Sequence, residues 1–349
     1  MKNLILSLML LMATSVMSVS AQNSLVATLN HNDTISVYYG VDALVNAYVK
    51  SVTGDVITLS SGNFNSCGYI SKGITIRGAG MEQDTINKVA PTILNGNLGL
   101  GDSNNLTFEG IWHVGTIYYD DTPSGYGSCS NVQFIKCRLN SFQKKSSSSF
   151  DCYIYDAKFI QCKIKNITAN GDAQFINCYV GAPGKDNTSS RMYFNCTNCV
   201  VYGSLVDVHV ESSIFTNCIL IGSNVMDESN MISNCIGVYT NTTDTINNLF
   251  TNSPSALIGN VCFRSAAEVF KTFRAPGTDN VTDAHSFELQ DSIRTKYLGT
   301  DGLEIGMYGG PLPFNPRNTL PKIKKFKVAP QSNAEGKLSV EIEVSAASE

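Results

Sequence analysis

Hydrophobic residues in the middle of the chain recur at intervals of about 20 residues. Six four-residue segments share one pattern, in which a hydrophobic residue is followed three positions later by Cys. They are residues 134–137, 159–162, 175–178, 196–199, 215–218 and 232–235. Successive copies are 25, 16, 21, 19 and 17 residues apart. An irregular repeat of this length predicts a solenoid, in which each unit buries its apolar face only by stacking on its neighbours.

The phase of the repeat predicts strands that are separated by a sharp corner. If each Cys is position 0, hydrophobic residues recur at positions −3 and +2, and in four copies at −5, whereas position −4 is polar in four copies. This alternation is typical of a strand with one buried face. Between positions −3 and 0 the inward phase slips by one residue, and Asn occupies position −1 in four copies. The slip predicts a corner, which Asn suits because it tolerates left-handed backbone angles.

The segment before the repeats predicts a cap. Residues 41–49 have hydrophobic side chains at helical spacing, and Gly54 and Asp55 follow where a helix would stop. We expect an amphipathic helix that closes the open end of the solenoid and covers an edge that would otherwise pair with another chain. The first coil is expected to follow, with residues 56–59 and 74–80.

The segments after the repeats predict a closing element and a tail. A short helix is expected at residues 265–273, and residues 322–328 and 338–344 predict two strands joined by a turn. The second strand alternates hydrophobic and polar residues, so we expect it to be half-buried. Because a lone hairpin is only marginally stable, the tail is expected to dock on another surface.

These features resemble the secreted right-handed parallel β-helix proteins that have the pectin-lyase-like fold. The resemblance rests on the phased repeats and on residues 54–80, which contain G-D-x-I-x-L-x-x-G-x-F followed by I-x-K-x-I-T-I-R-G-A-G. Stacked Asn residues commonly fill a tight corner in that family. Residues 299–310 are similar to the closing segment of many of its bacterial members. The predicted fold is therefore all-β, a single-stranded right-handed parallel β-helix with an N-terminal cap helix and a C-terminal β-hairpin tail.

Residues 1–21 predict a cleavable export signal. Lys2 provides a positive start, residues 4–12 are almost all hydrophobic, and small residues precede a cut after Ala21. The hydrophobic run is too short to span about 30 Å of hydrocarbon, which disfavours a membrane anchor. We expect a secreted, cell-surface or periplasmic protein with no transmembrane segment after signal removal. The other expected boundaries are 22–55 for the N-terminal cap, 56–310 for the β-helix with its closing segment, and 311–349 for the linker and hairpin tail.

Composition narrows the range of partners. Charged residues make up 15% of the chain and hydrophobic residues 43%, which is enough hydrophobic side chain for a large core. The formal net charge is −4, and no run of basic residues occurs. Because nucleic-acid binding depends on clustered Lys and Arg, we expect no nucleic-acid partner.

The 11 cysteines raise a choice between disulfides and buried thiols. Exported proteins often contain disulfides, but a recurrent inward position favours thiols that act as small hydrophobic side chains. The six cysteines at that position are Cys137, Cys162, Cys178, Cys199, Cys218 and Cys235. Disulfides remain the alternative for Cys67, Cys129, Cys152, Cys196 and Cys262. Cys196 and Cys199 have the spacing of half a zinc site, but no second such pair follows, so no metal site is expected.

Asp156 and Asp172 are candidate catalytic residues because both stand six positions before a repeat Cys. Adjacent coils would place them about 5 Å apart on one outer face, with Lys158 nearby. Paired carboxylates serve hydrolases as acid and base. The resemblance implies a second chemistry, since polysaccharide lyases of this fold use clustered carboxylates to hold Ca²⁺ against a uronate, with Lys or Arg as the base. The simpler interpretation is a solvated acid pair balanced by Lys158.

A second candidate site is an aromatic segment that interrupts the repeats after the single Trp. Aromatic faces stack on sugar rings and carboxylates accept hydrogen bonds from hydroxyl groups, so the segment could bind a glycan. The candidate binding residues are Trp112, Tyr118, Tyr119, Asp120, Asp121 and Tyr126. An ordinary surface loop is the alternative interpretation.

Two classes of function remain. The favoured hypothesis is an exported, non-catalytic binding, adhesion or structural module whose partners are polysaccharides or other cell-surface components. The alternative is a polysaccharide lyase or glycoside hydrolase that uses the outer-face carboxylates, and only this alternative would involve Ca²⁺. The fold cannot choose between them, because such scaffolds host both. The chain lacks the motifs of polygalacturonases and the acidic cluster of calcium-dependent pectate lyases, and its four His residues lack ligand spacing, which favours the non-catalytic class.

Overall fold

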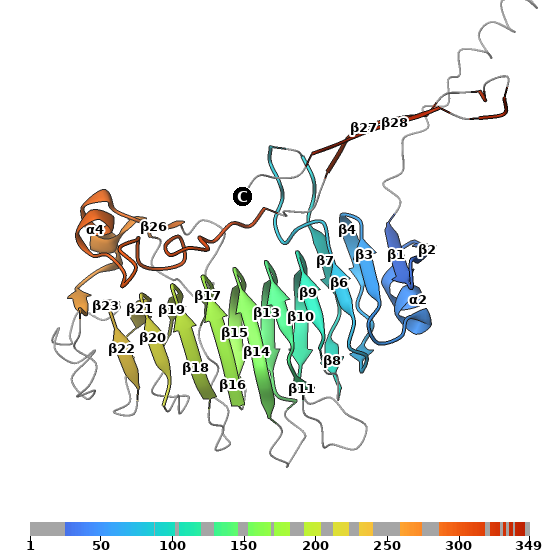
Figure 1. Cartoon of the computed structure of the whole chain (residues 1–349). Helices are drawn as coiled ribbons and strands as arrows, with labels where there is room; N and C mark the ends of the chain where they lie inside the picture. The colour runs from blue at the N-terminus through green and yellow to red at the C-terminus, as the bar shows by residue number, and fades with distance from the viewer. Residues whose placement is uncertain are drawn as a thin grey trace, which may run out of the picture.

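The protein is a parallel β-helix, in which successive coils stack side by side along one axis (Figure 1). The computed structural model describes residues 25–86, 88–101, 105–119, 129–145, 153–168, 171–181, 192–203, 212–222, 230–239, 259–273, 286–317, 322–328, 331–332, 335–337 and 339–345. The predicted export signal and Cys152 lie outside these residues. No helix among the described residues has the length and hydrophobicity needed to cross a membrane.

The first long sheet, sheet A, contains the strands that precede the corner, and its described members number 12. In spatial order they are β2 (Thr34–Tyr39), β1 (Val26–His31), β3 (Val56–Leu59), β6 (Thr75–Arg77), β9 (Thr107–Glu109), β12 (Gln133–Ile135), β14 (Ile154–Ile160), β16 (Gly171–Ile176), β18 (Met192–Thr197), β20 (Ile214–Thr216) and β22 (Met231–Ser233), with β11 (Cys129–Ser130) beside β14. From β3 onward the pairing is parallel.

The second long sheet, sheet B, contains the strands that follow the corner, again 12 among the described residues. In spatial order they are β4 (Gly62–Asn65), β7 (Thr92–Asn95), β10 (Trp112–Tyr118), β13 (Arg138–Gln143), β15 (Lys163–Thr168), β17 (Tyr179–Val180), β19 (Val200–Tyr202), β21 (Ile219–Gly222), β23 (Ile236–Tyr239) and β24 (Val261–Phe263), with β8 (Leu98–Leu100) beside β10 and β5 (Tyr69–Ile70) beside β8.

The corner between the sheets has the left-handed backbone that the repeat predicted. Position −1 is held in successive coils by Lys136, Gln161, Asn177, Asn198, Asn217 and Asn234, whose φ angles are between 50° and 56°. Gly110 and Gly259 occupy the equivalent place at either end of this row. Asn and Gly adopt this conformation at low cost, which explains their use at the corner.

Stacked aromatic rings fill the interior beneath sheet A. Phe134 stacks on Phe159 with ring centroids 5.1 Å apart, and Phe159 stacks on Phe175 at 4.9 Å. In the next coil Cys196 pairs in register with Phe175, while Phe194 turns inward and meets the Phe175 ring edge-on at 4.9 Å. The large and small residues have exchanged positions in this coil, and the interior remains filled.

The six repeat cysteines lie fully buried, one coil above another, and are not in disulfides. The amide N–H of each donates to the Sγ of the Cys in the next coil, at 3.3–3.5 Å, from Cys137 through to Cys235. The last amide, that of Cys235, donates instead to Oδ1 of Asn260 at 2.8 Å. Five of the six thiols, from Cys162 to Cys235, therefore satisfy a corner amide that the strands leave without a partner.

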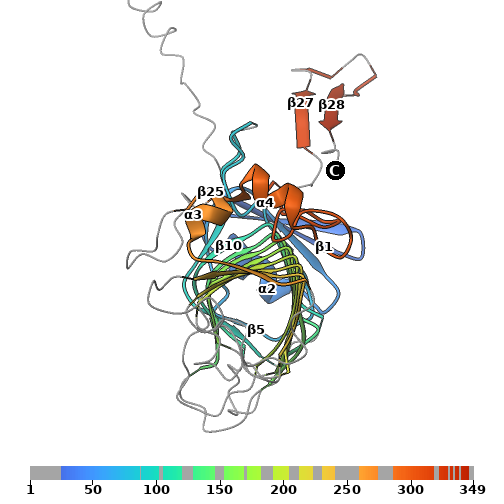
Figure 2. The ribbon, with the colours of Figure 1, turned by 90° about the vertical axis from the view of Figure 1, so that its left-hand side faces the viewer.

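The N-terminal end is closed by helix α2 (Ala43–Lys50), as predicted. Viewed along the axis, α2 lies across the far end of the coils (Figure 2). Its buried residues are Ala43, Leu44 and Ala47. Strands β1 and β2 form an antiparallel hairpin, and β1 also pairs with β3 at the N-terminal end of sheet A. The sequence interpretation did not include this hairpin.

Asp55 accepts hydrogen bonds from the Val52 amide and from His31. Burial would raise the pKa of this carboxyl, but the hydrogen bonds hold it below the ordinary value.

The C-terminal part of the chain returns along the outside of sheet B instead of ending as a last strand (Figure 1). It comprises α3 (Ala266–Val269), β25 (Phe270–Thr272), β26 (Ser286–Leu289), α4 (Asp291–Lys296) and a segment of turns, residues 299–317, which we call the strap. These elements and the outward side chains of sheet B form a second hydrophobic cluster. The predicted closing segment thus covers the flank of the solenoid.

The corner side chains hold the strap by its backbone. Asn217 Oδ1 accepts from the Thr300 amide, and Asn177 Nδ2 donates to the carbonyls of Met307 and Gly309 at 3.0 and 2.7 Å. Gln161 Nε2 donates to the carbonyl of Pro313 at 3.0 Å. The strap therefore crosses the coils in reverse order, one corner side chain at a time.

The C-terminal tail forms the predicted antiparallel hairpin of β27 (Lys322–Val328) and β28 (Val340–Ser345). The expectation of a half-buried, docked strand was wrong for the side chains that can be described. Val340 and Ile342 are 48% and 54% exposed. Figures 1 and 2 show the hairpin standing away from the coils, so the described coils do not cover these two side chains.

Candidate functional site

An open groove on the outer face of sheet A brings together the three candidate catalytic residues. Its volume is about 370 Å³. Its lining residues are Asp156, Ala157, Lys158, Asp172, Ala173, Gln174, Tyr193, Phe194, Asn195, Ser212 and Ile214. They come from β14, β16, β18, the first residue of β20 and Ser212 just before it, so the groove crosses four successive coils.

Two rows of outward side chains build the groove. Position −4 supplies Lys158, Gln174, Asn195 and Ile214, which are register partners in successive strands. Position −6 supplies Asp156, Asp172, Tyr193 and Ser212. Small residues stand between the rows at position −5 in the first two coils, Ala157 and Ala173. The repeat therefore aligns the polar groups, because each row takes one residue from every coil.

Asp156 and Asp172 line the same groove but are not direct register partners, which corrects the simple stacking expected from their equal repeat positions. The pairing of β14 with β16 shifts between Ile154 and Ala157, so Tyr155 and Asp156 together lie opposite Asp172. Asp156 has a left-handed φ of 53° at this bulge, and Asn131 in the preceding coil shares that conformation. The bulge turns Asp156 outward at the edge of the groove.

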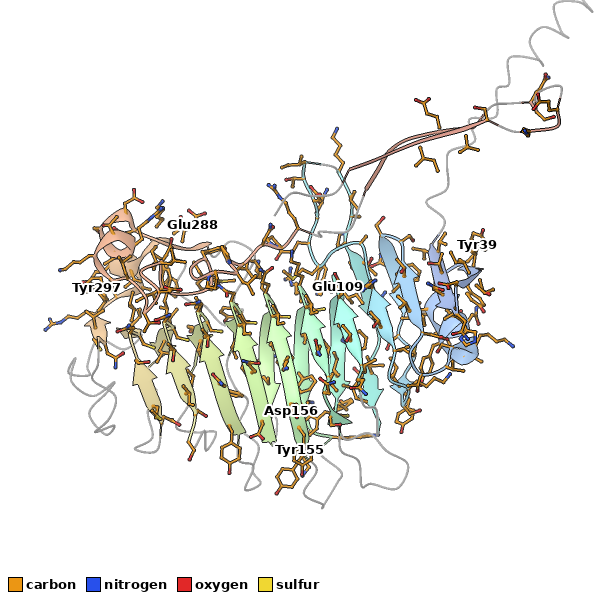
Figure 3. All side chains as sticks on the ribbon, viewed as in Figure 1. Tyr39, Glu109, Tyr155, Asp156, Glu288 and Tyr297 are labelled. Carbon is orange, nitrogen blue, oxygen red and sulfur yellow. The ribbon has the colours of Figure 1, made fainter. Side chains whose placement is uncertain are left out.

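Exposed tyrosines stand in or beside the groove. Tyr193 lines it and is 36% exposed. Tyr155 and Tyr153 are also exposed, with ring centroids 6.2 Å apart. Figure 3 shows Tyr155 next to Asp156 at the lower end of β14. The sequence interpretation did not select these tyrosines, although Tyr193 has the same repeat position as the two acids and could have been found from it.

The groove offers hydrogen-bonding and charged groups without a dense cluster of metal ligands. Asp156 and Asp172 are exposed and can accept hydrogen bonds, and Lys158 can donate them. Gln174 and Asn195 can do both. In the described part of the chain, no three side chains of His, Cys, Asp or Glu are placed to hold a metal ion together. Such a surface suits a ligand rich in hydroxyl groups.

The aromatic segment proposed as a glycan site does not form a surface among its described residues. Tyr119 is 1% exposed and stacks on Phe142 inside the solenoid, with centroids 5.7 Å apart, so it belongs to the core. Trp112 is half-buried under the guanidinium of Arg138, 4.4 Å from the ring centroid. Tyr118 is half-buried at the other end of β10. The remaining candidates, Asp120, Asp121 and Tyr126, lie outside the described residues.

Among the described residues, the cysteines singled out in the sequence and His113 are buried, except Cys67 and Cys262, which are half-buried against the core. Burial raises the pKa of Cys162, Cys199 and Cys235 well above the ordinary thiol value, so these thiols keep their protons. Burial also raises the pKa of Cys67 and Cys262 to about 12. His113 is 1% exposed, and burial lowers its pKa to about 4. None of these groups reaches the groove.

Comparison of the chain with protein-family models, with curated proteins and with solved structures returned no match. The fold itself therefore defines the class of protein, a parallel β-helix in which the described C-terminal residues cover the outer face of sheet B and leave a groove open on that of sheet A.

Proposed function

We propose that the protein is exported and acts outside the cytoplasm as a non-catalytic carbohydrate-binding module. The N-terminal sequence pattern supports export. The observation that carries the binding proposal is the groove, where the exposed ring of Tyr193 stands beside carboxylates and amides. A planar ring packs on the apolar face of a sugar, while the polar groups bind its hydroxyls.

The groove is open, which suits a chain that extends beyond the site at both ends. Successive coils are about 4.8 Å apart, a spacing comparable with the length of one sugar residue. A polysaccharide aligned with the solenoid axis would therefore meet equivalent positions of successive coils. A rigid scaffold loses little conformational entropy when it binds such a ligand.

The test is a binding screen of the purified protein against neutral, acidic and amino-containing polysaccharides by affinity electrophoresis and calorimetry. Tyr193→Ser copies the residue found at this position in the next coil, Ser212, and is expected to weaken binding at least tenfold. Tyr39→Ser is the matched control, because Tyr39 is 68% exposed at the N-terminal end of the molecule, far from the groove (Figure 3). Equal binding by the wild type and Tyr193→Ser would contradict the proposal.

A lyase or hydrolase is the second candidate, because Asp156, Asp172 and Lys158 line one groove. In this case one carboxylate or the lysine would transfer a proton and the second carboxylate would stabilise charge or bind Ca²⁺. Screening the same polysaccharides for unsaturated or reducing-end products, with and without Ca²⁺, tests it. Product formation that disappears in both Asp156→Asn and Asp172→Asn would replace the binding proposal with this one.

A further inference from the structure

The charge of the groove selects among carbohydrates. Its lining residues contain two carboxylates, Asp156 and Asp172, and one ammonium group, Lys158. Both aspartates are exposed, whereas Lys158 is half-buried. The lining side chains therefore carry a net charge of about −1 at neutral pH, and the negative groups are the more accessible ones. A polyanionic ligand such as a uronate would meet repulsion at this surface.

The chemical character of the groove also changes along the solenoid axis, from charged to aromatic to apolar. The aspartates come from β14 and β16, Tyr193 comes from β18, and Ile214 begins β20 and is 40% exposed. In the adjacent coil Met231 is the register partner of Ile214 and is exposed. A ligand along the axis would thus meet charge first, then an aromatic ring, then apolar side chains.

We infer that the groove binds oligosaccharides that contain amino sugars with free ammonium groups, an inference that rests on the proposed function. The ammonium group lies at the end formed by Asp156 and Asp172, where it makes charge-assisted hydrogen bonds with the carboxylates. The sugar ring that follows packs on Tyr193. Gln174 and Asn195 bind its hydroxyl groups, and Lys158 donates to a ring or hydroxyl oxygen.

The backbone at both acidic positions tolerates the substitutions that test this inference. Asp156 has a left-handed φ of 53°, and Asn holds the equivalent conformation at Asn105 and Asn131 in the two preceding coils. Asp172 lies in a regular strand and its side chain is exposed. Asp156→Asn and Asp172→Asn therefore remove one negative charge each with little change in shape. Asp33→Asn removes the same charge from the β1–β2 turn, away from the groove, and Asp33 also has a left-handed φ.

The experiment compares chitosan oligosaccharides, which carry free amines, with chitin oligosaccharides, which have the same backbone but acetylated amines. Calorimetry at pH 6 should show at least fivefold tighter binding of the chitosan oligosaccharides. Each Asn variant should lose about fivefold for chitosan oligosaccharides and stay unchanged for chitin oligosaccharides, and Asp33→Asn should match the wild type. Raising the pH until the ligand amines lose their protons should abolish the preference.

The outcomes separate the inference from the function on which it rests. Equal binding of both oligosaccharides, or a preference that survives in both Asn variants, would overturn the inference and leave carbohydrate binding intact. Binding of oligogalacturonate in preference to both would also overturn it. If no carbohydrate of any charge binds, the proposed function itself fails.

Discussion

The outer faces of sheets A and B are built from the same repeats, yet in the described part of the chain only the face of sheet B is covered. On sheet A the row at position −4 carries Lys158, Gln174 and Asn195, and it lines an open groove. On sheet B the row that follows the corner Cys starts with Arg138 and Lys163 and is apolar in the later coils, and the C-terminal part of the chain packs over this apolar stretch. This row contains Tyr179, Val200, Ile219 and Ile236. The difference shows that the cover lies where the outward row is apolar over several successive coils, whereas the row that lines the groove is polar as far as Asn195 and becomes apolar only at Ile214.

The covered face should be the more sensitive to truncation of a side chain. Phe287 is buried, stacks on Tyr179 at 5.0 Å and meets Phe270 edge-on at 5.7 Å. Phe287→Ala is expected to lower the free energy of unfolding by about 3–5 kcal/mol, because it leaves a cavity between cover and sheet. Urea denaturation measures this. A loss below about 1 kcal/mol would mean that the cover contributes little to stability.

Acid should lower the free energy of unfolding through His113, which is buried beneath sheet B. His113 lies between Leu94 and Leu139 in the interior row of that sheet, and its folded-state pKa of about 4 is below the ordinary value of 6.5. The unfolded chain therefore binds a proton more readily between these pH values. The stability contribution is complete above pH 6.5 and is lost as the pH falls to 4, by about 3 kcal/mol in total.

The variant His113→Leu isolates this effect, since Leu matches both neighbours in the row. Chemical denaturation of both proteins at pH 7 and pH 4.5 should show a smaller loss of stability in the variant, by about 2–3 kcal/mol. Parallel pH profiles for the two proteins would show that His113 is not the group responsible.

Corner side chains should contribute to the free energy of unfolding only in the coils where they form hydrogen bonds to the strap. Asn177→Gly keeps the left-handed backbone, as Gly110 and Gly259 do in the same row, and removes the two bonds to the strap. We expect a loss of about 1–3 kcal/mol. Asn234→Gly is the control, because among the described residues the hydrogen bonds between corner side chains and the strap end at Asn217. A similar loss in both variants would assign the effect to glycine entropy instead of the strap.

Substitutions on the bare face should have the smallest effect on stability. Lys158→Gln copies Gln133, the residue at the same position in the preceding coil, and Tyr193→Ser copies Ser212. Both are expected to change the free energy of unfolding by less than about 0.5 kcal/mol, as is usual for surface positions. Thermal denaturation checks this. A larger loss would mean that the groove is shaped by structural demands and would weaken the case for a ligand.

The repeats made the coils predictable, because each row of the solenoid takes one residue from every copy. The corner follows from the phase slip and from Asn177, Asn198 and their equivalents. The strap was not predictable, since residues 299–317 have no periodicity and are held through backbone carbonyls that any sequence carries. The β1–β2 hairpin was missed because its outer strand is exposed and lacks a clear alternation of burial.

The candidate site, like the fold, was predictable only where it follows the repeats. The repeat positions, −6 for Asp156 and Asp172 and −4 for Lys158, predicted one face for all three, and they do share a groove. The bulge at Asp156 was not visible, because a bulge depends on the number of residues in both neighbouring strands. Tyr119 was misassigned because polar neighbours in the sequence suggested a loop, whereas its side chain stacks on Phe142. Local composition could not reveal that tertiary contact.

The hydrogen-bonded column of thiols has a direction and an end. Each amide points to the sulfur of the following coil, until Asn260 supplies an oxygen where another Cys would otherwise stand. A duplicated coil inserted after Cys235 would extend the column by one step and meet the same Asn at its end. The thiol column would therefore keep its end after such a duplication, whereas the segment between α4 and the strap would have one more coil to cross. Each added coil would lengthen the outer face of sheet A by about 4.8 Å.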